Sequence, residues 1–275
     1  MDQMNYTAPV PPVSVPPAQP VYATSCLRAA WDDVRATPNY VGRLLVLGLI
    51  MCVPVLNFVV AGYLLFWSRE VPFGGRSALP QKIVTGKNFE FGFYAFVISL
   101  VVGLAGGVVG GILGWVPLLG WIVALAISLA TYVAVAIMEM RMIMGMSLGE
   151  GFNVKDIWEK AKRNWGQLLL ATLVPMAIII GVTVVLSIVV FSIMFICCMG
   201  AVPAIAAMGG AADPSLVQIM SVFGAIAVPV LLCSLVLYVV LSVLETFAQA
   251  VAIRGVAHWV ARYAPEWTTL SVPRY

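Results

Sequence analysis

Long apolar runs constrain this chain more than any other feature of its sequence. A helix needs about 20 predominantly apolar residues to cross roughly 30 Å of hydrocarbon. Four runs meet that length, at residues 91–115, 117–138, 168–199 and 219–244. Hydrophobic residues make up 62% of the 275-residue chain and charged residues only 10%, so a soluble fold could not cover its surface. The sequence therefore predicts an all-α fold, a polytopic transmembrane helical bundle with four full spans.

A fifth apolar run, residues 44–67, is interrupted by Pro54 and Asn57. Proline removes a backbone donor, and an asparagine amide is a polar group at which the chain can turn. Two interpretations stay open: a re-entrant hairpin of two half-membrane helices, or a single Pro-kinked fifth span. We favour the hairpin because charged segments flank the run on both sides.

Lysine and arginine residues are confined to four segments of the chain. All 15 of them lie in the N-terminal region, in residues 68–90, in residues 139–167 and near the C-terminus. The turn at residues 115–121 and the loop at residues 200–218 have none. By the positive-inside rule, the charged loops and the C-terminus are cytoplasmic and the two other connections are external. The sequence thus predicts a multi-pass protein of the cytoplasmic membrane.

Composition divides the chain into three parts. Six prolines within a dozen positions predict that residues 1–24 form a disordered Pro-rich tail. Residues 25–263 are expected to form the helical membrane domain, and residues 264–275 a C-terminal tail.

Two short segments that precede apolar runs predict interfacial amphipathic helices, at residues 25–35 and 153–165. In the second, apolar residues recur at helical spacing between charged ones, and Asn153 with an aspartate three residues later predicts an N-terminal cap. The repeated theme suggests a weak internal duplication, with halves at about residues 25–145 and 153–263. Chance or shared interfacial chemistry explains the similarity at least as well.

The first of these segments also begins a set of family motifs. Trp-Asp-Asp-Val-Arg at residues 31–35 leads to Pro-Asn-Tyr at residues 38–40, and Val-Pro-Val-Leu-Asn-Phe follows at residues 53–58. This pattern resembles the start of the bacterial and archaeal membrane proteins grouped as domain of unknown function 4013. The resemblance covers roughly residues 25–260. It implies a multi-span helical membrane protein and supplies no activity, ligand or catalytic residue.

Six glycines in the first full span form two overlapping GxxxG series. Bare backbone lets helices approach closely, so this strip predicts a helix-packing face. The alternative is that the strip lines a pore or a lipid groove. The glycines are Gly103, Gly106, Gly107, Gly110, Gly111 and Gly114.

Two acidic residues, Glu139 and Glu245, each end a predicted span. Interfacial anchoring is the simpler interpretation, since a side chain at a span end reaches headgroup water. The alternative is a proton or cation site formed by the pair, because ionisable residues within a membrane are commonly functional.

Several basic and aromatic residues near span ends predict contact with the anionic headgroups of the lipid bilayer. Three of them recur every four residues beyond the last span and would form a basic stripe on one helix face. The predicted headgroup residues are Trp158, Lys160, Arg163, Arg254, His258 and Arg262.

The sequence contains no constellation of nucleophile, base or metal ligands that would indicate catalysis, so we expect no enzyme activity, cofactor or metal. The net charge of +3 is too small and dispersed for a nucleic-acid partner. These features favour a non-enzymatic membrane scaffold or envelope-associated factor, with room for a protein partner or a homo-oligomer. The alternatives are a small permease or lipid-handling transporter, in line with interrupted helices, and less favoured, a membrane enzyme.

Overall fold

The structure, a computed structural model, describes residues 24–115, 119–209 and 216–270. Every regular element in these ranges is a helix, which confirms the all-α prediction. The Pro-rich tail predicted for residues 1–24 lies outside the described residues except at its last position.

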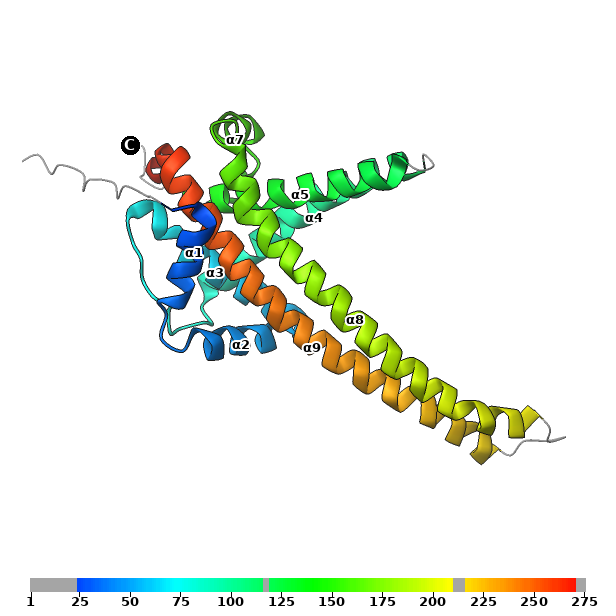
Figure 1. Cartoon of the computed structure of the whole chain (residues 1–275). Helices are drawn as coiled ribbons and strands as arrows, with labels where there is room; N and C mark the ends of the chain where they lie inside the picture. The colour runs from blue at the N-terminus through cyan, green and yellow to red at the C-terminus, as the bar shows by residue number, and fades with distance from the viewer. Residues whose placement is uncertain (1–23, 116–118, 210–215, 271–275) are drawn as a thin grey trace, which may run out of the picture.

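Two long helix pairs diverge from a packed body (Figure 1). The first pair consists of α4 (Gly86–Gly114) and α5 (Leu119–Gly145), and the second of α8 (Trp165–Gly209) and α9 (Leu216–Tyr263). These four helices are each long and apolar enough to cross a membrane, as the four-span prediction requires. The charged connections lie in the body. The C-terminal ends of α4 and α8 and the N-terminal ends of α5 and α9 lie at the far tips of the pairs.

The second pair is longer than predicted. α8 and α9 have 45 and 48 residues, which corresponds to about 67 and 72 Å at the helical rise. The loop predicted for residues 200–218 is therefore wrong in its extent, because helix occupies all of it except residues 210–215, which lie outside the described residues. Apolar chain in an apolar medium satisfies its backbone hydrogen bonds by remaining helical. The predicted end of the last helix near Pro265 is confirmed, since α9 ends at Tyr263.

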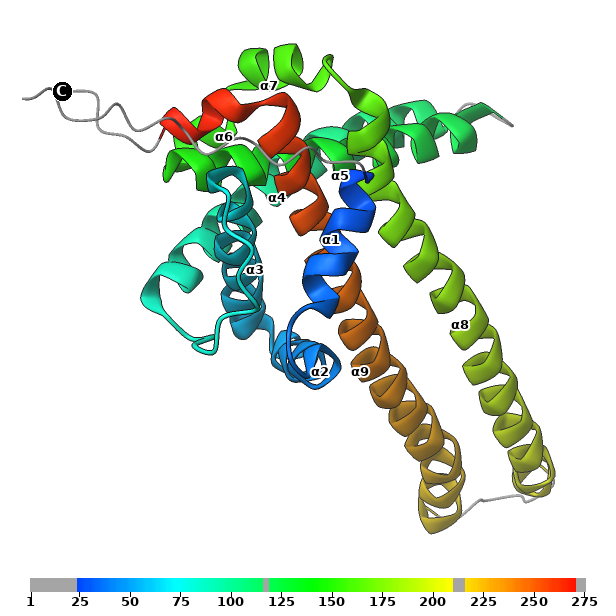
Figure 2. The same cartoon turned by 60° about the vertical axis from the view of Figure 1, so that its left-hand side comes forward.

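The body is built around the bases of these pairs. α1 (Cys26–Arg35) and α3 (Pro54–Arg69) lie beside α9 and α4, and the short helices η1 (Val71–Phe73) and α6 (Leu148–Gly151) fill the turns (Figure 2). Buried apolar side chains from these elements form two adjoining clusters. The outer parts of the long pairs carry exposed aliphatic side chains instead, as surfaces in contact with lipid do.

The predicted interruption at Pro54 is confirmed. α2 (Tyr40–Met51) ends before Val53, which is extended, and Pro54 is the first residue of α3. The two helices meet at a sharp corner (Figures 1 and 2). Asn57 lies in the first turn of α3 and not in the break itself, which corrects its predicted role. Entry of this segment into the bilayer stays a prediction.

α3 and α4 approach each other backbone to backbone. A Cβ atom added at Gly62 would lie 1.8 Å from the carbonyl oxygen of Asn88, and one added at Gly92 would lie 1.7 Å from that of Phe58. Only a hydrogen fits at either position. These two glycines therefore fix the base of the α4–α5 pair against the body.

The two predicted interfacial helices, α1 and α7 (Val154–Ala161), share a local arrangement. The predicted cap at Asn153 is confirmed, because its side chain accepts a hydrogen bond from the Asp156 amide. A tryptophan of each helix meets, edge to face, the first residue of the next helix: Trp31 with Tyr40, and Trp158 with Trp165. A duplication would leave such a likeness, and it stays a prediction.

The C-terminal segment differs from the predicted tail over its first part. Residues Pro265–Thr269 form the short helix η2, in which Trp267 is buried. Its indole Nε1 donates to Asp156 Oδ2 at 2.8 Å, and its ring lies 5.2 Å from the guanidinium carbon of Arg141. Arg141 is itself buried and paired with Glu150 and Asp156. The segment thus ties α5 to α7.

Candidate functional site

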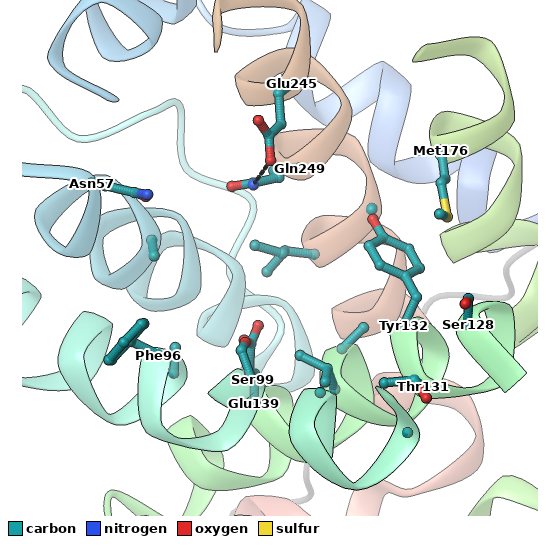
Figure 3. Close-up of a pocket in the computed structure, with 18 of the residues that line it drawn as sticks. Asn57, Phe96, Ser99, Ser128, Thr131, Tyr132, Glu139, Met176, Glu245 and Gln249 are labelled. Atoms are coloured by element: carbon teal, nitrogen blue, oxygen red, sulfur yellow. Dashed lines mark hydrogen bonds between the residues drawn. The ribbon is translucent and has the colours of Figure 1, made fainter. Parts of the chain in front are cut away.

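A partly open cavity of about 850 Å³ lies where the two long pairs separate. It is lined by residues of α2, α3, α4, α5, α8 and α9, and we call it the cleft (Figure 3). Its wall is mostly apolar, with Phe96 and Met176 among the lining side chains. It also receives several residues that the sequence singled out for unrelated reasons.

The glycine strip lines the cleft. Five of the six glycines, all except Gly114, belong to the cavity wall. A Cβ added at Gly106 would lie 2.3 Å from Thr131 Oγ1 on α5, so the packing prediction is confirmed there. At Gly103, Gly107 and Gly111 an added Cβ would meet nothing within 4 Å. The packing prediction is wrong for these positions within this chain, and the alternative, a strip that lines a groove, fits them.

The two acidic residues face the same cleft from different pairs. Glu139 on α5 accepts a hydrogen bond from Ser99 Oγ of α4 at 3.0 Å. Glu245 on α9 accepts one from Gln249 Nε2 at 3.1 Å. Neither carboxylate makes an ion pair with any residue that the structure describes. The cleft therefore places two carboxylates, each held by a neutral donor, in an apolar wall.

Sequence reasoning missed the polar side chains that accompany these carboxylates. Ser128 and Tyr132 line the cleft on the same face of α5 as Glu139 (Figure 3). Their spacing, with Tyr132 four residues after Ser128 and seven before Glu139, is the signal that could have shown a shared face. Asn57, expected only as a helix break, also lines the cavity.

The cleft offers groups that can bind a ligand. Its walls offer apolar contact and hydrogen-bond acceptors, and the described part of the chain contains no group of three or more His, Cys, Asp or Glu residues that could hold a metal ion. Carboxylates with neutral partners attract a cationic or hydrogen-bond-donating group.

A second group of polar residues is buried in the body and corrects the predicted headgroup stripe. The side chains of Arg254 and His258 are fully buried, so neither can contact a headgroup. Asp33 Oδ2 lies 2.9 Å from Arg254 Nε and 2.9 Å from His258 Nε2. The guanidinium also donates to the Trp67 carbonyl oxygen and lies over the Trp67 ring. The stripe is covered because α1 and α3 pack on this part of α9.

Asp33 is the key member of this buried group, and the sequence analysis did not single it out. Burial raises the pKa of its carboxyl group, but the hydrogen bond from His258 and the charge of Arg254 outweigh burial and hold the pKa below its ordinary value. The sequence signal that could have identified Asp33 as buried is its position, three residues after Ala30 and beside Val34 on the buried face of α1. The group ties α1 to α9.

The remaining predicted headgroup residues lie at the surface of the body. Trp158 is exposed, and Arg262 is half-buried. Lys160 and Arg163 both pair with Glu266 of η2, at 3.2 and 2.8 Å. Headgroup contact by Trp158 stays a prediction, whereas Lys160 and Arg163 have a partner within the chain.

We expect acid to loosen the C-terminal segment. The hydrogen bond from Arg163, helped by Lys160, lowers the pKa of Glu266 from its ordinary 4.5 to about 2. A carboxyl group whose pKa is lowered by folding stabilises the folded protein at pH values above its ordinary pKa. For Glu266 that contribution is lost as the pH falls from about 4.5 towards 2. Hydrogen exchange over residues 265–270, corrected for intrinsic rates, should rise across this range. Glu266→Gln should remove the acid-dependent step and the exposed Glu159→Gln should not, so a step that persists in Glu266→Gln contradicts the assignment.

The fold and the cleft define the class of the protein. Four helices of spanning length and an apolar cavity between them make it an α-helical integral membrane protein. Comparisons of the chain with protein-family models, curated proteins and solved structures gave no match.

Proposed function

We propose that the protein is a non-enzymatic, lipid-handling membrane protein that binds an amphiphile with an amine-bearing head in the cleft. The observation that carries the proposal is the pair Glu139 and Glu245, which face one apolar cavity and whose hydrogen-bond partners among the described residues are neutral. An ammonium group would supply the missing positive charge, and a hydrocarbon chain would cover the glycine strip.

The apolar wall decides between an amphiphile and a simple ion. An ion would leave most of a cavity of about 850 Å³ lined by apolar atoms without contacts. A chain-bearing ligand fills that space and places its head at the carboxylates. The cleft opens between two helix pairs, so a ligand could enter from the bilayer.

Membership of the family of domain of unknown function 4013 is part of this proposal, and a scaffold role stays a prediction.

The test uses dodecylamine and dodecanol, which share a chain and differ in head charge. Native mass spectrometry of the protein in a neutral detergent should show a preference for dodecylamine. In the double variant Glu139→Gln, Glu245→Gln this preference should fall by roughly tenfold or more, because each lost charge-assisted hydrogen bond is worth about 1.5–3 kcal/mol. The matched control is Glu159→Gln, an exposed glutamate on α7 outside the cleft. Equal binding of the two probes by the unaltered protein contradicts the proposal.

A second variant fills the cleft without changing its charge. Gly107→Leu should leave folding intact, since an added Cβ meets nothing within 4 Å, and should reduce binding of both probes. Gly181→Leu on α8 is the control, because its surroundings are equally open and it does not line the cavity. Unchanged binding in Gly107→Leu would place the ligand elsewhere.

A further inference from the structure

A second groove lies on the outside of the body, between α1, α8 and α9, and has a volume of about 720 Å³. Its long wall comes from α8 and α9 and is apolar. Ile178 on this wall is 60% exposed, so the wall faces the surrounding medium. The α8 part of the groove runs from Val174 to Val182, about 12 Å at the helical rise, from the charged base of the pair into its apolar part.

One face of α1 forms the rim of this groove. Arg28, Trp31, Asp32 and Arg35 are spaced at i, i+3, i+4 and i+7, which places them on one side of the helix. All four are exposed and line the groove. The opposite face of α1 is buried, and Asp33 on that face is bonded to Arg254. The exposed arginines are therefore held at the edge of the groove by a fixed helix.

The rim of the groove carries a net positive charge that no ion pair within the described residues neutralises. Neither Arg28 nor Arg35 makes an ion pair there, and Asp32 leaves one net positive charge on this face. Guanidinium groups bind phosphate oxygens in a bidentate manner, and tryptophan favours the boundary between headgroups and hydrocarbon.

We propose that this groove binds an anionic phospholipid. The phosphate accepts hydrogen bonds from Arg28 and Arg35, Trp31 lies at the headgroup boundary, and one acyl chain follows the apolar wall of α8 and α9. A free phosphate would satisfy the arginines but leave the wall bare. The site is separate from the cleft and takes a ligand of opposite head charge, so it does not depend on the proposed function.

A different groove of the same protein can be compared with the groove beside α1. A groove of about 530 Å³ lies under α7, between α5 and α8, and it too has tryptophans at its rim, Trp158 and Trp165. None of the described residues that line it is charged. We expect that groove to accept hydrocarbon without regard to headgroup charge, so selectivity for anionic lipid should follow the arginines of α1.

The experiment measures lipid retention by native mass spectrometry in a neutral detergent, with phosphatidylglycerol and phosphatidylcholine of the same acyl chains. The unaltered protein should retain more phosphatidylglycerol. The double variant Arg28→Gln, Arg35→Gln should lower that preference by roughly fivefold for each arginine. Lys155→Gln, an exposed cation on α7 that lines neither groove, is the matched control and should keep the preference.

A second variant keeps the proposal testable if the arginine variant does not fold. Ala248→Leu narrows the groove on α9 with both arginines intact and should reduce retention of both lipids. An unchanged preference in the arginine variant, or an equal loss in Lys155→Gln, overturns the proposal. Displacement of phosphatidylglycerol by the same concentration of inorganic phosphate, or a protein dimer that lipid does not dissociate, overturns it as well.

Discussion

Asp33→Asn is expected to destabilise the protein by about 3–5 kcal/mol, because it removes the only carboxylate hydrogen-bonded to the buried Arg254 among the described residues. A charge left in the interior without its counter-ion costs far more than the pair contributes when intact. The measurement is thermal or denaturant unfolding in a neutral detergent, followed by tryptophan fluorescence. The pKa of Asp33 is already lowered, so stability should also fall as the pH drops through its ordinary value, 3.8, towards the lowered one.

The neighbouring residue provides the control for this prediction. Asp32→Asn changes the same functional group one position away, but Asp32 is exposed, so its effect should stay within about 0.5 kcal/mol. A double variant, Asp33→Leu with Arg254→Met, should recover much of the loss because it removes both buried charges together. If Asp33→Asn behaves like Asp32→Asn, the buried group does not hold α1 to α9.

Gly62→Ala and Gly92→Ala are expected to have the second large effect. Each added methyl group would lie within 2 Å of a backbone oxygen of the facing helix, which cannot move aside as a side chain can. α3 and α4 must separate, and the expected cost is at the upper end of the 1–3 kcal/mol typical of overpacking, or beyond it. Unfolding in detergent measures the loss, and reduced yield of folded protein would accompany it.

Gly103→Ala is the matched control for these variants. It lies on the same helix, α4, as Gly92, but an added Cβ meets nothing within 4 Å. Its effect should be small, and a gain of about 0.5–1 kcal/mol is in keeping with the higher helix propensity of alanine. A loss in Gly103→Ala as large as in Gly92→Ala would show that helix propensity, and not the α3–α4 contact, governs these positions.

Local features of the fold were predictable from the sequence. The four spanning helices depend on continuous apolar runs, and the break at Pro54, the cap at Asn153 and the end of α9 each depend on residues within one or two turns. Periodicity also showed correctly that Arg254 and His258 share one helix face. It could not show that α1 covers that face, because Asp33 is 221 residues away from Arg254 in sequence.

The candidate site was predictable only in pieces. The sequence singled out the glycine strip and both glutamates, but it assigned the glycines to packing and favoured interfacial anchoring for the carboxylates. The cleft exists because two helix pairs diverge from one body, and divergence is a property of tertiary contacts such as Gly62 against Asn88. A pattern within one span contains no information about the angle to the next.

The attachment of both helix pairs at one end gives the molecule the mechanics of a lever. α8 is about 67 Å long, so a rotation of about 5° at its base displaces its tip by about 6 Å. Conversely, a large displacement of the tip corresponds to a small displacement near the base. The cleft lies beside that base. Glu139 and Glu245 lie on different pairs, so a small rotation of one pair about its base would change the distance between the two carboxylates.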